Sequence, residues 1–104
     1  MRKSALVVGF GVSGQASAAL LLKKGFRVIA ADCNPRIAPS LQEVPIWADR
    51  PDIPLDDFSF AVISPGIPSS HPLLHALQQK GIEMLGEIEL ALRFLKNEKI
   101  AAIT

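Results

Sequence analysis

Three glycines spaced as G-x-G-x-x-G place the strongest constraint on the fold of this chain. Gly9, Gly11 and Gly14 separate an apolar run, Ser4–Val8, from a helical pattern rich in small residues. In this position the first glycine permits a tight turn, the second lets the backbone approach a phosphate, and the third lets the helix pack on the strand. Free amides at the helix N-terminus also favour an anion. The motif therefore predicts a phosphate-binding loop rather than a simple turn.

Apolar runs alternate with helical patterns along the rest of the 104 residues. Each parallel strand needs a crossover connection, so this alternation indicates a parallel sheet with helices on both faces. We predict an α/β fold, a Rossmann-like doubly wound parallel sheet in a single domain. Strands are expected at 4–8, 27–32, 46–48, 58–64 and 82–85, and helices at 12–24, 72–80 and 87–95.

The C-terminal residues indicate a domain boundary. Residues 99–104 form another strand-like run, so we assign 1–98 to this domain and 99–104 to the start of a following one. The helix before the boundary has four apolar residues at i, i+3, i+4 and i+7, the pattern of an amphipathic helix: Ile88, Ala91, Leu92 and Leu95.

A second glycine loop follows the strand predicted at 58–64. Ser64 offers a hydroxyl, Pro65 lacks an amide donor, and Gly66 presents a bare backbone amide. Loops after parallel strands lie at one edge of the sheet, so we expect both loops to converge on one phosphate-containing ligand that need not be a dinucleotide. The loop could also cap the next helix, with His71 or a nearby serine as N-cap. Both interpretations can hold together.

Asp32 ends the second predicted strand, where an acidic side chain commonly accepts hydrogen bonds from a ribose diol. It could equally accept the N3 proton of a uracil ring, or form an ordinary turn before Asn-Pro. Asp32 alone therefore does not identify which nucleotide binds.

We predict neither a catalytic residue nor a metal site in this chain. Glu87 and Glu89 are interpreted as acidic residues that favour a helix N-terminus, not as a catalytic pair. His71 and His75 have the spacing of half a zinc site, but no third ligand is evident nearby in the sequence.

Composition narrows the partners and the compartment. Lys plus Arg number 11 against 10 Asp plus Glu, without a basic cluster, so we expect no nucleic acid. A single cysteine, Cys33, is typical of a reducing cytoplasm. No apolar stretch reaches the ~20 residues of a membrane span. The first 18 residues imitate a signal peptide, but we reject that alternative because the glycines fit a strand–loop–helix.

Several motifs together resemble the N-terminal domain of the UDP-N-acetylmuramoyl-L-alanine:D-glutamate ligases of the Mur ligase family. They are the loop of Gly9 to Gly14, Ser64 to Ile67, His71-Pro72, Gly81 to Glu83 and Gly86 to Leu90. The resemblance covers essentially the whole chain. Ala101 to Thr104 is similar to the strand that in this family runs into an ATP-binding P-loop.

The resemblance implies a cytoplasmic, ATP-dependent and ADP-forming ligase that adds D-glutamate to UDP-N-acetylmuramoyl-L-alanine in peptidoglycan synthesis. ATP, Mg²⁺ and D-glutamate would bind to further domains. This chain would hold the UDP end of the substrate, bind no cofactor itself, be inactive alone and be monomeric.

The resemblance also implies roles for residues in three segments. The nucleotide and its phosphates would contact Gly11, Val12 and Ser13, the uracil would contact Asp32, Cys33 and Asn34, and the diphosphate would contact Ser64, Pro65 and Gly66. The chain departs from the family at Cys33-Asn34, where members often have Thr-Arg, and cysteine is the poorer hydrogen-bond partner.

Two alternatives remain open from the sequence. The glycine loop with Asp32 also suits an NAD(P)-binding Rossmann domain of a dehydrogenase or a nucleotide-sensing regulator. A Rossmann-like interaction module that binds no nucleotide is the third possibility.

Overall fold

A computed structural model describes residues 3–33 and 44–103, and the side chains of these up to Leu95. Five parallel strands form one sheet in the order β3-β2-β1-β4-β5. The strands are β1 (Ser4–Val8), β2 (Arg27–Asp32), β3 (Ile46–Ala48), β4 (Phe58–Ile63) and β5 (Glu83–Gly86). The helices are α1 (Val12–Lys23), α2 (Pro72–Gln79) and α3 (Glu87–Ile103). The predicted α/β fold is confirmed, and every predicted boundary except the end of α3 agrees within one residue.

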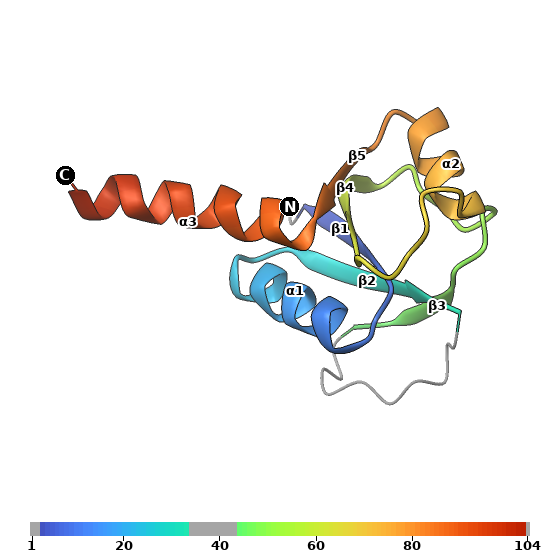
Figure 1. The fold of residues 1–104 in the computed structure, drawn as a ribbon, viewed down its shortest axis with the longest axis horizontal. Coiled ribbons are helices and arrows are strands. Elements are labelled where there is room, and N and C mark those ends of the chain that lie inside the picture. The colour runs from blue at the N-terminus through green and yellow to red at the C-terminus, as the bar shows by residue number, and fades with distance from the viewer. Residues whose placement is uncertain (1–2, 34–43, 104) are drawn as a thin grey trace.

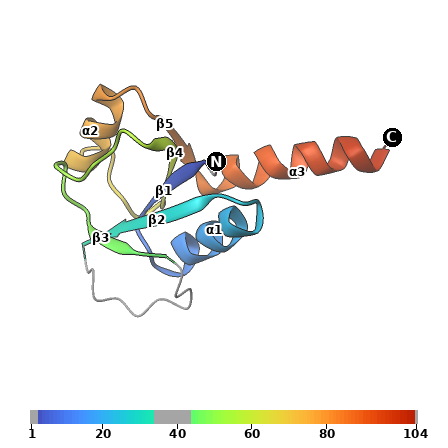
Figure 2. The same cartoon turned by 180° about the vertical axis from the view of Figure 1, so that it is seen from behind.

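Helices cover both faces of the sheet (Figures 1 and 2). Successive residues of a strand point to opposite faces, so the central strand β1, which is buried along its whole length, feeds two cores. Ala5 and Val7 pack with Ala18 and Leu21 of α1 and with Leu90 of α3. The other core joins the opposite face of β1 to the buried leucines of α2: Leu6, Val8, Leu73, Leu74 and Leu77.

The order of the strands creates a switch point between β1 and β4. From β1 the chain adds β2 and then β3 on one side, and it then returns to place β4 and β5 on the other side. Val8, the last residue of β1, is in register with Ala31 of β2 and with Ile63 of β4. In an open α/β sheet the ligand crevice lies at the carboxyl ends of the strands, at such a switch point.

The predicted strand at residues 99–104 is wrong for residues 99–103, which continue α3. A helix satisfies its backbone hydrogen bonds within the segment, whereas a strand needs a neighbouring strand to pair with. Figure 1 shows α3 running away from the sheet, where no described strand accompanies it. Thr104 lies outside the described residues, and the domain boundary between 98 and 99 stays a prediction.

The apolar stripe of α3 does not face the core. Ile88, Leu92 and Leu95 expose 76%, 57% and 54% of their surface, whereas Leu90 exposes 1%. Phe94, one helical turn beyond Leu90, packs against the core that α1 covers. The sequence contains two apolar rows at helical spacing, and the row of Leu90 and Phe94 is the one that reaches the sheet.

Candidate functional site

The loops after β1 and β4 meet at the switch point. The Ser64 amide donates a hydrogen bond to the Val8 carbonyl at 3.0 Å, and the Ser64 hydroxyl donates to the Gly9 carbonyl at 3.3 Å. The Gly9 amide donates to the Ala31 carbonyl at 2.7 Å, so the first loop is also fixed to β2. The two glycine loops therefore meet as predicted, and their binding of one phosphate-containing ligand stays a prediction.

Two of the three glycines are required by close packing. Gly9 has φ +89°, a conformation that favours glycine, and an added Cβ would lie 2.9 Å from the Ser64 Cβ. An added Cβ on Gly14 would collide with the Gly9 carbonyl oxygen. These contacts match the expected roles of the first and third glycines, in the turn and in the packing of the helix on the loop.

The start of α1 is open. Gly11 is the N-cap, with ordinary extended backbone, and no described heavy atom beyond its chain neighbours lies within 4 Å of where its Cβ would be. Val12 exposes 90% of its surface and Ser13 is half-buried. No side chain caps α1 in the described structure, and its first turn has no acidic residue. Its first amides therefore present partial positive charge to an anion.

Asp32 positions the first loop. Its Oδ2 accepts a hydrogen bond from the Phe10 amide at 2.6 Å, and the Phe10 side chain is fully buried. The carboxylate thus links the end of β2 to the glycine loop, a contact that sequence reasoning missed. Cys33, the next residue, is exposed beside it. The third residue assigned to the uracil, Asn34, lies outside the described residues.

The exposed residues Pro65 and Gly66 continue the second loop, which leads to α2. His71 is the N-cap of α2: its Nδ1 accepts a hydrogen bond from the Leu73 amide at 3.1 Å. Since Nδ1 is an acceptor, Nε2 carries the ring proton and donates to Asp49 Oδ2 at 2.9 Å. The predicted N-cap is confirmed, and the imidazole is fully engaged in holding the loop.

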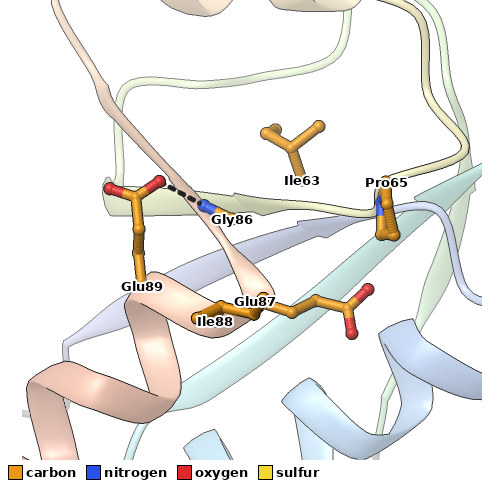
Figure 3. Close-up of a pocket in the computed structure, with 6 residues that line it drawn as sticks. All are labelled: Ile63, Pro65, Gly86, Glu87, Ile88 and Glu89. Atoms are coloured by element: carbon orange, nitrogen blue, oxygen red, sulfur yellow. Dashed lines mark hydrogen bonds between the residues drawn. The ribbon is translucent and has the colours of Figure 1, made fainter.

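A cavity of about 410 Å³ lies between the second loop and the start of α3 (Figure 3). Six residues line it: Ile63, Pro65, Gly86, Glu87, Ile88 and Glu89. Glu89 Oε1 accepts a hydrogen bond from the Gly86 amide at 3.1 Å, the return contact of a capping box.

Glu87 extends in a different direction from Glu89, toward the side of the cavity where Pro65 lies (Figure 3). Its Oε1 is buried and has no hydrogen-bond partner among the described residues. Leaving such an acceptor unpaired costs about 1–3 kcal/mol. Sequence reasoning explained Glu87 by the helix dipole and missed this cavity, although a glycine and an acid directly after a predicted strand could have indicated it.

The described residues contain no group of three or more His, Cys, Asp or Glu side chains placed to hold a metal ion. Within the same residues, no helix has both the length and the apolar character needed to cross a bilayer.

Residues 3–86 match the family model described as Mur ligase MurD-like, N-terminal domain. The UDP-N-acetylmuramoylalanine–D-glutamate ligase of Caldicellulosiruptor bescii is 41% identical over 110 residues, which cover 98% of this chain and 24% of the relative. The enzyme of the same name from Aquifex aeolicus is 40% identical over 99 residues, covering 95% of this chain and 21% of the relative. The chain thus spans about a quarter of the length of these relatives.

A crystal structure of the UDP-N-acetylmuramate-alanine ligase MurC from Thermotoga maritima has the same fold. It matches 95% of this chain and 24% of its own chain, with a TM-score of 0.73 and 17% sequence identity.

Proposed function

Since this chain belongs to the Mur ligases as a MurD-like N-terminal domain, we propose that it binds the UDP end of UDP-N-acetylmuramoyl-L-alanine. The complete protein would be a cytoplasmic, monomeric ligase that adds D-glutamate to this substrate in peptidoglycan synthesis. The family is the one that the sequence motifs indicated.

The observation that carries the proposal is the junction of the two glycine loops. The open start of α1 and the exposed residue Gly66 lie on loops joined through Ser64 and Gly9. A diphosphate needs several donors on more than one side. We assign the diphosphate to this junction and the uracil to the neighbouring end of β2, at Asp32 and Cys33.

In the proposed reaction this chain binds and orients the substrate. ATP and Mg²⁺ would convert the alanyl carboxylate into an acyl phosphate, because a carboxylate is a poor electrophile until one oxygen becomes a leaving group. The amine of D-glutamate would then attack the acyl carbon and displace inorganic phosphate, which leaves an amide bond. We assign ATP, Mg²⁺ and D-glutamate to the parts of the relatives that this chain does not span, so the chain alone should have no ligase activity.

Calorimetric titration of the chain with UDP-N-acetylmuramoyl-L-alanine, UDP and NAD tests the proposal. We expect the muramoyl substrate to bind most tightly, UDP more weakly, and NAD least. A Gln79→Ala variant, changed at an exposed residue of α2, should behave as the unmodified chain. Tighter binding of NAD would overturn the proposal in favour of an NAD(P)-binding domain, and no binding of any nucleotide would favour an interaction module.

A further inference from the structure

One oxygen of the half-buried Glu87, Oε1, is a buried polar atom that the proposed diphosphate and uracil contacts leave unexplained. The position of Glu87 at the first residue of α3 suits its negative charge, because the helix dipole favours an acid there. The dipole does not supply a hydrogen-bond donor to Oε1, which has none among the described residues. Buried acceptors in native proteins are nearly always paired, so Oε1 needs a donor from outside the described residues.

The walls of the cavity indicate the chemistry of a ligand that would supply this donor. Ile63, Pro65 and Ile88 give it apolar sides, and Glu89 is already bound to the Gly86 amide. A phosphate is disfavoured, because it would bring negative charge against an unpaired carboxylate. A neutral group with an apolar face and hydroxyl or amide donors, such as an acylamino sugar, matches both the walls and the carboxylate.

The cavity borders the candidate diphosphate loop at Pro65. Pro65 lines it and stands between Ser64, which binds the Gly9 carbonyl, and Gly66, whose amide we assign to the diphosphate. A sugar attached to a diphosphate at the loop junction would therefore lie next to the cavity. The uracil base would then lie on the opposite side of the junction, at the end of β2.

We propose that Glu87 accepts a hydrogen bond from a hydroxyl or amide N–H of the acylamino sugar of a UDP-sugar ligand, which fills the cavity between the second loop and α3. This inference rests on the proposed function and deepens it by assigning the sugar. Glu87 is then a residue that favours the sugar-bearing ligand over free UDP.

Comparative titration with UDP and UDP-N-acetylglucosamine tests the role of Glu87. The unmodified chain should bind the sugar nucleotide more tightly than UDP. Glu87→Ala should reduce this preference about tenfold, the effect of losing a charge-assisted hydrogen bond, and leave the affinity for UDP unchanged. Glu87→Gln keeps the size of the side chain but removes its charge, and should reduce the preference less.

Glu83→Gln is the matched control, since Glu83 is an exposed acid of β5 that pairs with Arg93 outside the cavity. It should leave the preference unchanged. Thermal unfolding of each variant establishes that it folds. If Glu87→Ala does not fold, the isosteric Glu87→Gln carries the test.

The outcomes separate the two proposals. Binding of UDP with no gain from the sugar, or a gain that survives both Glu87 variants, overturns the role of Glu87 and leaves the proposed function standing. A gain that requires added Mg²⁺ would replace the direct hydrogen bond by a bridging cation and also overturns the inference. No binding of UDP by the unmodified chain overturns both proposals.

Discussion

The starts of α1 and α2 lie at the same edge of the sheet but are built in opposite ways. α1 follows β1 through glycines, and no side chain caps it in the described structure. α2 follows β4 and is closed by the His71 ring, with Pro72 in its first turn. A helix start that is to bind a ligand must leave its amides unpaired, whereas a structural one is more stable when its own chain pairs them. The comparison therefore supports the proposal that α1 is the helix that binds the anion.

Gly14→Ala should have the largest effect, because it removes the packing that holds α1 on its loop. The new methyl group would occupy the position of the Gly9 carbonyl oxygen, which is backbone and cannot rotate away. We expect a loss of about 3 kcal/mol in the free energy of unfolding. Urea denaturation measures it. Gly66→Ala, at a position with no close described neighbours, should change stability by less than about 1 kcal/mol.

A Gly14→Ala variant as stable as the unmodified chain would contradict this packing role. The start of α1 would then tolerate a side chain at Gly14, and close packing would not distinguish it from the start of α2.

His71→Ala removes the side chain that closes α2. The Leu73 amide loses its acceptor and Asp49 loses its donor, so we expect a loss of about 2 kcal/mol in unfolding free energy. Asp49→Asn keeps an oxygen that can accept from Nε2, and should lose less than about 1 kcal/mol. Equal losses in the two variants, measured by urea denaturation, would show that the contact with Asp49 matters more than the cap.

Features set by residues close together in the chain could be predicted from the sequence. The strands are short, mostly apolar runs that end at or within three residues of a glycine or proline, so local pattern sets their bounds. The two loops follow from the ends of β1 and β4. The His71 cap was also predictable, because it involves neighbours in the chain.

Contacts between segments that are distant in the sequence could not be predicted from local sequence pattern. The bond from Phe10 to Asp32 and the unpaired oxygen of Glu87 depend on how β2 and α3 are placed beside the loops. Helical spacing identified an apolar row on α3, but which row meets the sheet depends on the direction in which the helix leaves β5. The spacing of the apolar residues alone does not predict that direction.

Gly11→Ser gives α1 the cap that α2 already has. Serine is a favoured N-cap and the backbone of Gly11 is already extended, so stability should rise by a few tenths of a kcal/mol. The hydroxyl would pair an amide that we assign to the phosphate, and UDP affinity should fall about tenfold, or ~1.4 kcal/mol. Thermal unfolding and calorimetry measure the two effects. An unchanged affinity of Gly11→Ser for UDP would contradict the proposal that the start of α1 binds the phosphate.

The start of α3 extends the comparison and gives the smallest expected effect. Like α2 it is closed by its own chain, through Glu89, and Arg93 on its second turn donates two hydrogen bonds to Glu83 of β5. These bonds, and then the guanidinium charge, hold the pKa of Glu83 below its usual value. A lowered pKa contributes stability above the pKa of the unfolded chain, and this contribution is lost as pH falls through the folded pKa.

Arg93→Gln should therefore destabilise the chain slightly at neutral pH, and the difference from the unmodified chain should vanish as Glu83 becomes protonated. The pair is exposed, so added salt should also reduce the difference. Gly11→Ser introduces no charge at a helix start without acids, and its effect on stability should not change over the same pH range. Urea denaturation of both variants between neutral pH and the acidic range tests this. If the difference in unfolding free energy between Arg93→Gln and the unmodified chain grows on acidification, Glu83 does not stabilise α3 through its charge. The bond from the Gly86 amide to Glu89 would then be the main side-chain contact at the start of that helix.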